Sequence, residues 1–406
     1  MATSDRSRLR SALGFTLVEL LVSTSLLLLL ALMLVALTHE TSRTLAFTTG
    51  KAEQFRGARE AFENLTHRLS QATLNTYWDY DYGTAVSNEP SRYARRSELR
   101  FICGPAGHDE FLGQPADPNR RRVGHGVFFQ APLGFSDNVR GLENLLNTWG
   151  YFVEYGNDDR YRPSVIPAAA APERWRFRLL AFMPSAEENL IYHFTSGWVD
   201  PAALRKQPRS AEYREMGWFR DQCNAGDPPT HVVAENVIAL ILTPRLAARE
   251  EAQFPDHEAQ PDFSPLAPDY VFDSSPAPSR LLSADDPRYA DARLNPVAQL
   301  PPLIEVTMVA IDEPSAQRLN LARGDENCFG LVNDGKSGKF TQSAQLTADL
   351  RRDPSRPFGR STGAHSSFDQ GGPLENTLIG ARVNYRIFST RVALRGAKWS
   401  RAQGER

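Results

Sequence analysis

The chain has 406 residues, of which 41% are hydrophobic and 23% charged, so most of it can bury a core and general disorder is excluded. Its 46 basic and 48 acidic residues nearly cancel, and the formal net charge of −2 offers no global basic excess, so no nucleic-acid partner is expected. The three cysteines, Cys103, Cys223 and Cys328, form no CxxC pair, which excludes a zinc knuckle or a thioredoxin-type motif. Two alternatives stay open: one disulfide with one free thiol, or three isolated thiols. The odd number of cysteines favours the three isolated thiols.

The N-terminal residues predict a membrane anchor. Residues 1–13 carry three arginines and a single aspartate, so this short basic segment should stay in the cytoplasm by the positive-inside rule. Residues 15–37 follow as an apolar run that would be about 35 Å long as a helix, against a hydrocarbon core of about 30 Å. The run is longer than the hydrophobic part of an ordinary signal peptide, and no A-x-A site follows it. We therefore expect a transmembrane helix, with the remainder of the chain on the far side.

Glu19 is the unusual residue of this run. A carboxylate at the centre of a membrane helix costs about 2.5–3.5 kcal/mol, and acids within membranes usually have a partner. A lone acid near the boundary could instead reach the lipid headgroups. The order Gly14, Phe15, Thr16, Leu17, Val18, Glu19, followed by further apolar residues, favours a partner.

This order resembles the class III signal sequence of type IV prepilins and pseudopilins. The resemblance implies that a dedicated membrane peptidase cuts after Gly14 and that the new terminus, Phe15, is N-methylated. It also implies that Glu19 pairs with the N-terminal amine of a neighbouring subunit during assembly. An acid and an amine are each costly in lipid, and together they offset one another.

The segment 38–76 predicts an amphipathic continuation of this helix. Two interleaved sets of apolar residues recur every seven positions, as the a and d positions of a helix do. The sets are Phe55, Phe62 and Leu69, and Ala58, Leu65 and Ala72. Because the stretch is short for a free coiled coil, we expect it to pack on its own domain. Together the two segments would form a long pilin-type helix, half in lipid and half docked on a head.

The remaining residues, 77–406, predict a β-rich exported head. Alternation of apolar and polar residues favours an antiparallel sheet with one face on the N-terminal helix, and hence an α+β fold. The predicted strands are 98–104, 126–132, 149–156, 174–182, 231–245, 302–312 and 381–389, the last of which could extend to 396.

Two segments predict long loops within the head. Residues 244–302 hold eleven of the 28 prolines and read as a loop insertion or a disordered segment. Residues 353–373, rich in Arg, Ser, Gly and Pro, read as a second, flexible loop, and 341–353 favours a short helix between them.

Three stretches of the head extend the resemblance. They are SQATLNTYWDYDYG after the helix, AENVIALILTPR in the middle and NYRIFSTRVALRGAKWS near the end. They resemble prepilin-like protein C of the Verru_Chthon cassette. A large head of this kind is also similar to the J-type minor pseudopilin at the tip of type II secretion pseudopili, whereas the K-type tip protein typically lacks the acid that Glu19 supplies.

Several short motifs suggest chemistry that their surroundings do not favour. GLVNDGKS at 330–337 has Walker A spacing around Lys336 and Ser337, yet turn-forming residues precede it and no helix is predicted directly after it. GRSTG around Ser361 lies in a predicted loop and not in a strand–turn–helix elbow. DYDYG at 79–83 favours a turn over a calcium loop, because the downstream glutamate is missing. His125, in GHGVFF, is expected to be structural.

These observations predict a structural assembly protein, with no catalytic residue, cofactor or metal site. We expect a single-pass protein of the bacterial inner membrane, with the N-terminus cytoplasmic and the head in the periplasm or on a surface filament. Its partners would be the prepilin peptidase, other pilin or pseudopilin subunits, the inner-membrane assembly platform and lipid. The bulky head favours a minor or tip subunit. Two alternatives stay open: an exported, anchored enzyme using Ser361 or Lys336, and a tethered binding module that never polymerises.

Overall fold

The structure is a computed structural model. It describes residues 16–81, 89–90, 92–161, 174–189, 191, 216–276, 279–319, 328–333, 335–355 and 372–399. The chain divides into two units, Met1–Gln54 and Phe55–Arg406, and each is described by itself.

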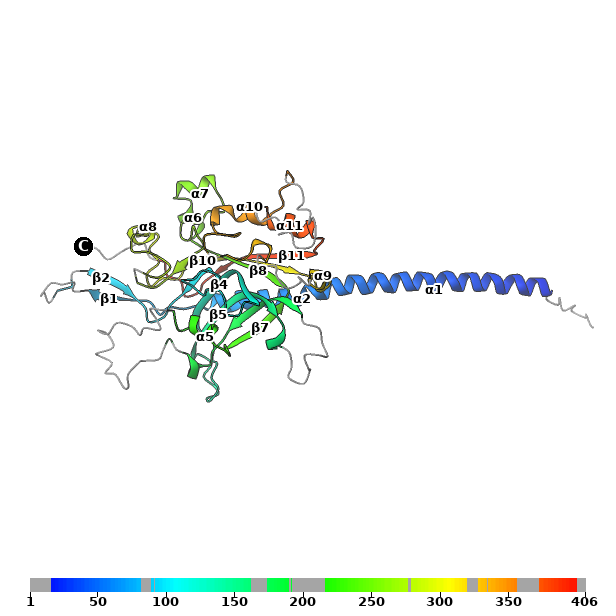
Figure 1. Cartoon of the computed structure of the whole chain (residues 1–406), viewed down its shortest axis with the longest axis horizontal. Coiled ribbons are helices and arrows are strands. Elements are labelled where there is room, and N and C mark those ends of the chain that lie inside the picture. Colours follow the sequence, from blue (N-terminus) through cyan, green and yellow to red (C-terminus); the bar gives the residue numbers. More distant parts are fainter. Residues whose placement is uncertain are drawn as a thin grey trace, which may run out of the picture. The chain divides into compact units, whose positions relative to one another are not determined.

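The first unit contains one long helix, α1 (Leu17–Gln54), labelled in Figure 1. Its segment Leu17–Thr38 has 22 residues and is long and apolar enough to cross a membrane, with none of it buried within the chain. The expected N-terminal apolar helix is therefore present. A signal sequence meets the same test of length and composition.

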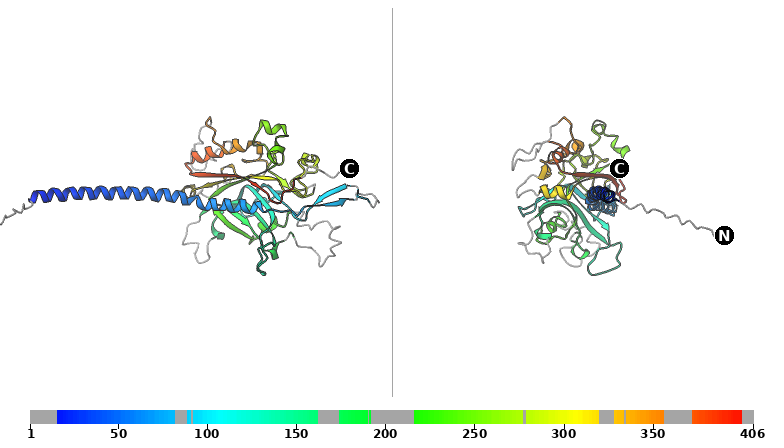
Figure 2. Two further views of the ribbon diagram at one scale, coloured as in Figure 1. Left: turned by 180° about the vertical axis from the view of Figure 1, so that it is seen from behind. Right: turned by 90° about the vertical axis from the view of Figure 1, so that its right-hand side faces the viewer.

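The second unit begins with α2 (Arg56–Ser70), which lies along the strands of the head (Figure 2). All six residues of the predicted seven-residue pattern belong to its core: five are buried and Phe55 is partly buried. The ring of Phe62 lies 5.7 Å from that of Phe388 on β11 (Tyr385–Ala393). The helix ends at Ser70, short of the expected boundary at 76, because Thr73 already donates its backbone N–H to Gln130 on β4 (Arg120–Pro132).

Replacing Phe62 with alanine should destabilise the head by about 3 kcal/mol, since truncating a buried phenylalanine removes its contacts and leaves a cavity. Phe62 is 8% exposed, so little of the lost contact can be replaced by water. Urea unfolding of the full chain in detergent measures the effect. Glu63→Ala is the matched control on the same helix: Glu63 is exposed and pairs with Arg59, so a change below about 0.5 kcal/mol is expected. Equal midpoints for the two variants would contradict this packing.

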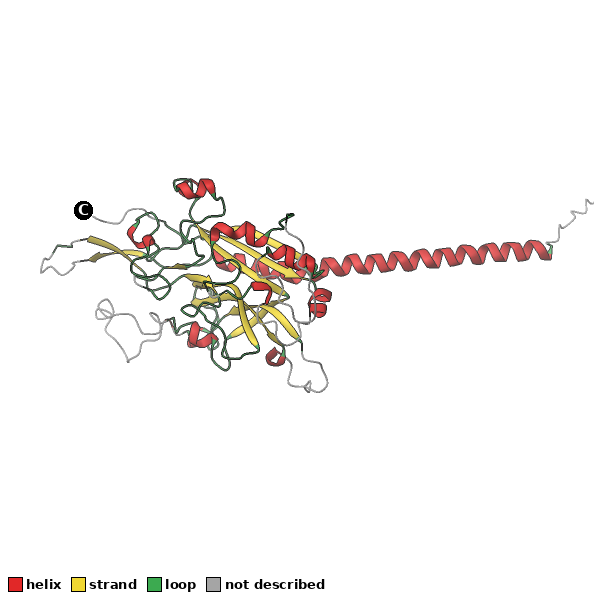
Figure 3. Ribbon diagram, turned by 45° about the horizontal axis from the view of Figure 1, so that its top comes forward, coloured by secondary structure: helices red, strands yellow, loops and turns green. Residues whose placement is uncertain are grey.

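The head contains three antiparallel sheets in the described residues, where a single sheet was expected. Figure 3 shows the strands forming the body of the unit, with short helices around them. The largest sheet has the order β7-β6-β5-β4-β3-β9, the second the order β11-β10-β8, and β1 and β2 form a separate ribbon. The remaining strand bounds are β1 Tyr77–Asp81, β2 Arg92–Arg96, β3 Ile102–Pro105, β4 Arg120–Pro132, β5 Leu146–Asn157, β6 Trp175–Phe182, β7 Thr230–Glu235, β8 Val237–Arg245, β9 Phe272–Asp273 and β10 Leu303–Ile311.

The division into two large sheets occurs at Asn236, inside the run predicted as one strand. Asn236 has φ of 61°, a left-handed conformation that asparagine tolerates better than most residues. The chain therefore turns between β7, which pairs with β6, and β8, which pairs with β10. One sequence segment thus contributes to both sheets.

The two large sheets meet where β4 approaches β8. The pairing of β4 with β5 shifts register between Val123 and Val127, and Gly124 lies in this bulge with φ of 63°. A Cβ at Gly124 would lie 2.7 Å from the Leu240 carbonyl oxygen. Only glycine permits so close an approach, which explains the glycine that precedes His125.

The proline-rich segment 244–302, expected as a loop insertion or a disordered segment, packs on the head where it is described. Leu266, Tyr270 and Phe272 are buried, and β9 pairs with β3. The described part holds three short helices: α6 Ala248–Glu251, α7 Pro255–Ala259 and α8 Pro287–Ala290.

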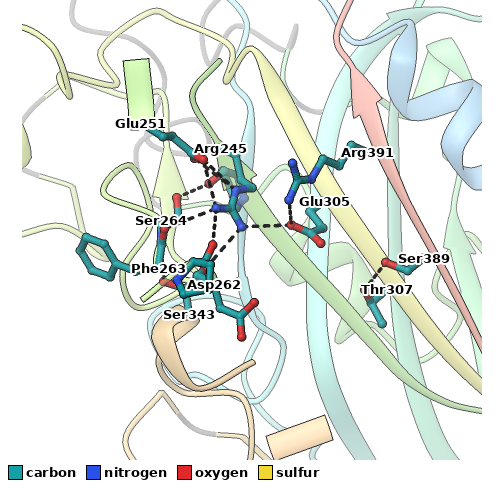
Figure 4. Close-up of polar contacts among 12 residues, drawn as sticks. Arg245, Glu251, Asp262, Phe263, Ser264, Glu305, Thr307, Ser343, Ser389 and Arg391 are labelled. Atoms are coloured by element: carbon teal, nitrogen blue, oxygen red, sulfur yellow. Dashed lines mark hydrogen bonds and ion pairs between the residues drawn. The ribbon is translucent and has the colours of Figure 1, made fainter. Parts of the chain in front are cut away.

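The Arg245 guanidinium ties this segment to the second sheet (Figure 4). It contacts Glu251 at 3.0 Å and Glu305 on β10 at 3.1 Å, and it donates to the Pro261 carbonyl at 3.0 Å. Arg245 and Glu251 are both nearly inaccessible to solvent. Buried ion pairs need this kind of complete hydrogen bonding to offset the loss of water.

The other described helices are short and lie between the strands in sequence. The predicted helix at 341–353 is a 3-10 turn, Ser343–Gln345, followed by α10, Leu346–Leu350. Residues 356–371 of the expected flexible loop lie outside the described residues. The remaining helices are α5 Arg220–Cys223, α9 Glu313–Leu319 and α11 Leu374–Gly380, with 3-10 turns at Asp159–Tyr161, Ala186–Glu188 and Cys328–Gly330.

Candidate membrane and assembly segment

Glu19 lies in the first turn of α1 and is bound by Thr16. The backbone N–H of Thr16 donates to Glu19 Oε2 at 3.1 Å, and the Thr16 hydroxyl donates to the same oxygen at 3.0 Å. The backbone N–H of Glu19 lies 3.3 Å from Thr16 Oγ1. This is a capping box, in which a threonine at the helix start and an acid three residues later satisfy each other's exposed groups.

The capping box gives Glu19 a role within its own chain that sequence reasoning missed. The signal was present, since a threonine followed three residues later by a glutamate before an apolar run is a helix-start pattern. Both donors from Thr16 are neutral, so they orient the carboxylate without neutralising its charge. A cation would still be needed to offset that charge in lipid.

The other polar side chains in this part of α1 are satisfied by the helix itself. The Ser23 hydroxyl donates to the Glu19 carbonyl at 2.6 Å, and Thr24 donates to the Leu20 carbonyl at 2.9 Å. Ser25 donates to the Val22 carbonyl at 2.8 Å. Hydroxyls bonded in this way carry only a small free-energy penalty in lipid. An ionised carboxylate, as at Glu19, would carry a large one.

The predicted cleavage site, Gly14 and Phe15, lies outside the described residues. Among the described residues of the predicted signal, Thr16 is the one that binds the Glu19 carboxylate. Leu17 and Val18, which lie between them, are exposed.

The Walker-like motif lacks the helix that nucleotide binding requires. A 3-10 turn precedes it, and residues 335–342 form bends up to the turn at Ser343. Gly335 and Gly338 have φ of 85° and 100°, and a Cβ at Gly335 would lie 2.3 Å from the His108 ring. The glycines thus serve a tight loop packed on a neighbouring segment. Ser361 lies outside the described residues.

The DYDYG motif begins in a strand and not, as expected, in a turn. Asp79 lies in β1 and forms an ion pair with Arg96 of β2 at 3.0 Å. Trp78, Tyr80 and Tyr93 lie on one face of this ribbon and are 46–58% exposed. No group of three or more metal-binding side chains occurs in the part of the chain that the structure describes.

Cys103 and Cys223 are buried free thiols in two different hydrophobic clusters. Burial raises the pKa of both, that of Cys223 to about 12. Both are therefore protonated at neutral pH and poor nucleophiles. The side chain of Cys328 lies outside the described residues.

Comparisons with known proteins give no match. No protein-family model, curated protein or solved structure matches this chain. What can be said of function therefore rests on the chain's own residues.

Proposed function

We propose that this chain is a prepilin-like assembly protein that is trimmed after Gly14 and joins a type IV pilus-like or type II secretion filament through its N-terminal helix. The observation that carries the proposal is an acidic side chain, Glu19, in the first turn of a helix able to span a membrane, bound only to neutral donors of Thr16 in the described residues. Cleavage after Gly14 would create an amine at Phe15. That amine, on an adjacent subunit, supplies the cation that Thr16 does not.

In this proposal the basic leader stays in the cytoplasm and the head is exported. The prepilin peptidase removes the leader and methylation of Phe15 preserves the positive charge. An assembly platform then transfers the helix from the inner membrane into the filament. A head of this size, built around two large sheets and an ordered insertion, suits a minor or tip subunit better than a repeating one, since a repeating subunit must pack against many copies of itself.

Mass spectrometry of the mature N-terminus tests the proposal. Protein isolated from membranes of cells with an active prepilin peptidase should begin at Phe15 and carry one N-methyl group. The same chain expressed without the peptidase should keep Met1 or the residue after it. A full-length N-terminus in the presence of the peptidase, or a start elsewhere than Phe15, would overturn the assignment.

The second candidate is a membrane-tethered binding module that never polymerises. The capping box favours this candidate, because the hydrogen bonds with Thr16 give Glu19 a structural role at the helix start within a single chain. This candidate needs neither cleavage nor a partner subunit. Intact protein in membranes, with the leader attached, is the result that it predicts.

A further inference from the structure

His125 joins the two large sheets of the head. It lies in the bulge of β4, between Gly124 and Gly126, and is fully buried. Its Nδ1 accepts the backbone N–H of Leu242 on β8 at 3.1 Å, and its Nε2 donates to the Phe340 carbonyl at 3.0 Å. One imidazole therefore bridges β4, β8 and the loop before α10.

These contacts fix the neutral tautomer of the ring. A carbonyl can only accept, so Nε2 carries the proton, and an N–H can only donate, so Nδ1 must be bare. β8 is the last strand of its sheet, and its Leu242 N–H points away from β10 toward β4. The imidazole replaces the strand partner that this buried N–H lacks.

We propose that His125 is an acid-sensitive joint: protonation of its ring releases β8 from β4 and opens the contact between the two sheets. A second proton on Nδ1 would place two donors face to face, so Leu242 would lose its acceptor. The buried cation would then need water, which only opening of the joint supplies.

The burial of the His125 ring also favours opening of the joint at low pH. Burial lowers the pKa of His125 to about 4 from its ordinary 6.5, so the closed joint binds the proton less well than the open one. Between these two pH values the open state holds more protons, and acidification shifts the equilibrium toward it by up to about tenfold per pH unit. The contribution to stability is complete above pH 6.5 and is lost progressively as the pH falls toward 4.

The other ionisable groups nearby do not produce the same effect. Those on the segments around the ring are Tyr270, Lys339, Asp349, Arg122 and Arg245. Tyr270, whose ring centroid lies 4.5 Å from that of His125, has its pKa raised by burial and stays neutral. Burial also raises the pKa of Asp349, so its protonation favours the closed state as the pH falls.

Hydrogen exchange of the full chain in detergent micelles tests the joint. Amide protection of β8 (Val237–Arg245) is compared with that of β5 (Leu146–Asn157), each normalised to the unstructured rate at the same pH. We expect β8 to lose about 20-fold in protection relative to β5 between pH 7 and pH 5, as a single proton with these two pKa values requires. Equal protection of the two strands at both pH values, or an equal loss in both, would overturn the proposal.

His125→Asn provides the matched variant. The asparagine oxygen can occupy the position of Nδ1 and accept the Leu242 N–H, and it cannot be protonated, so the extra loss in β8 should disappear. His231→Asn, at an exposed position on β7, should leave it unchanged. A full acid response in His125→Asn overturns the proposal. If this variant does not fold, the comparison of β8 with β5 in the unmodified chain still decides it.

Discussion

Replacing Glu19 with glutamine should abolish incorporation of the chain into a filament while leaving its membrane helix intact. Glutamine can serve in the same capping box, so the helix start that Thr16 and Glu19 form should survive. What the substitution removes is the negative charge that a neighbouring N-terminal amine would pair with. Sheared surface filaments, separated from membranes and probed for this chain, give the incorporated fraction.

Two further variants separate the charge from the cap. Thr16→Val removes the hydroxyl and keeps the carboxylate; it should cost about 1 kcal/mol at the helix start and retain incorporation. Glu19→Leu removes both features and should behave as Glu19→Gln does. Mass spectrometry should show normal cleavage between Gly14 and Phe15 in all three variants. Wild-type incorporation of Glu19→Gln would contradict pairing between subunits, and failure of Thr16→Val alone would show that the cap is the feature that matters.

The helical part of the fold could be predicted because its signals are local. The apolar run is long enough to span a membrane on composition alone, and the seven-residue pattern places its six residues in the core. The end of α2 could not be predicted in this way, since Thr73 leaves the helix to bond Gln130 on a strand far along the chain. A contact at that separation has no trace in the local sequence.

The arrangement of the strands was harder to predict than their existence. Most expected strands are present, but their division into sheets depends on one asparagine, Asn236, that turns the chain between β7 and β8. The β1–β2 ribbon was missed because Asp79 favours turns in isolation, whereas its ion pair with Arg96 forms only once the strands are paired. The packing of the insertion could not be predicted, because proline content says nothing of distant contacts such as those of Arg245.

The candidate site was also only partly predictable from the sequence. The order from Gly14 to Glu19 can be read directly, and so can the capping pattern of Thr16 and Glu19. The partner that neutralises Glu19 belongs, in our proposal, to another subunit, and a single chain carries no contact that reveals it. His125 shows the converse: its residue type gave no function, and its two hydrogen bonds across three segments suggest one.

Arg245→Met should destabilise the head by about 3–5 kcal/mol, because it leaves the Glu251 carboxylate buried without its cation. The methionine fills part of the space but offers no hydrogen to the acid. Urea unfolding of the full chain in detergent measures the loss, and proteolysis should show early cleavage within residues 246–264. Arg293→Met is the control: its pair with Asp291 is partly exposed, so a change below about 1 kcal/mol is expected.

A double substitution tests whether the loss in Arg245→Met comes from the unpaired Glu251 charge or from lost packing of the arginine side chain. Removing both charges, with Arg245→Met and Glu251→Leu together, should recover most of the loss, since a buried pair replaced by apolar residues of similar volume is often close to neutral. Full recovery is not expected, because Glu305 also contacts Arg245 and would keep, within the described part of the chain, its 3.5 Å contact with Arg391. If Arg245→Met costs no more than Arg293→Met, the network in Figure 4 does not hold the insertion on the sheet, and the buried apolar residues Leu266, Tyr270 and Phe272 alone must do so.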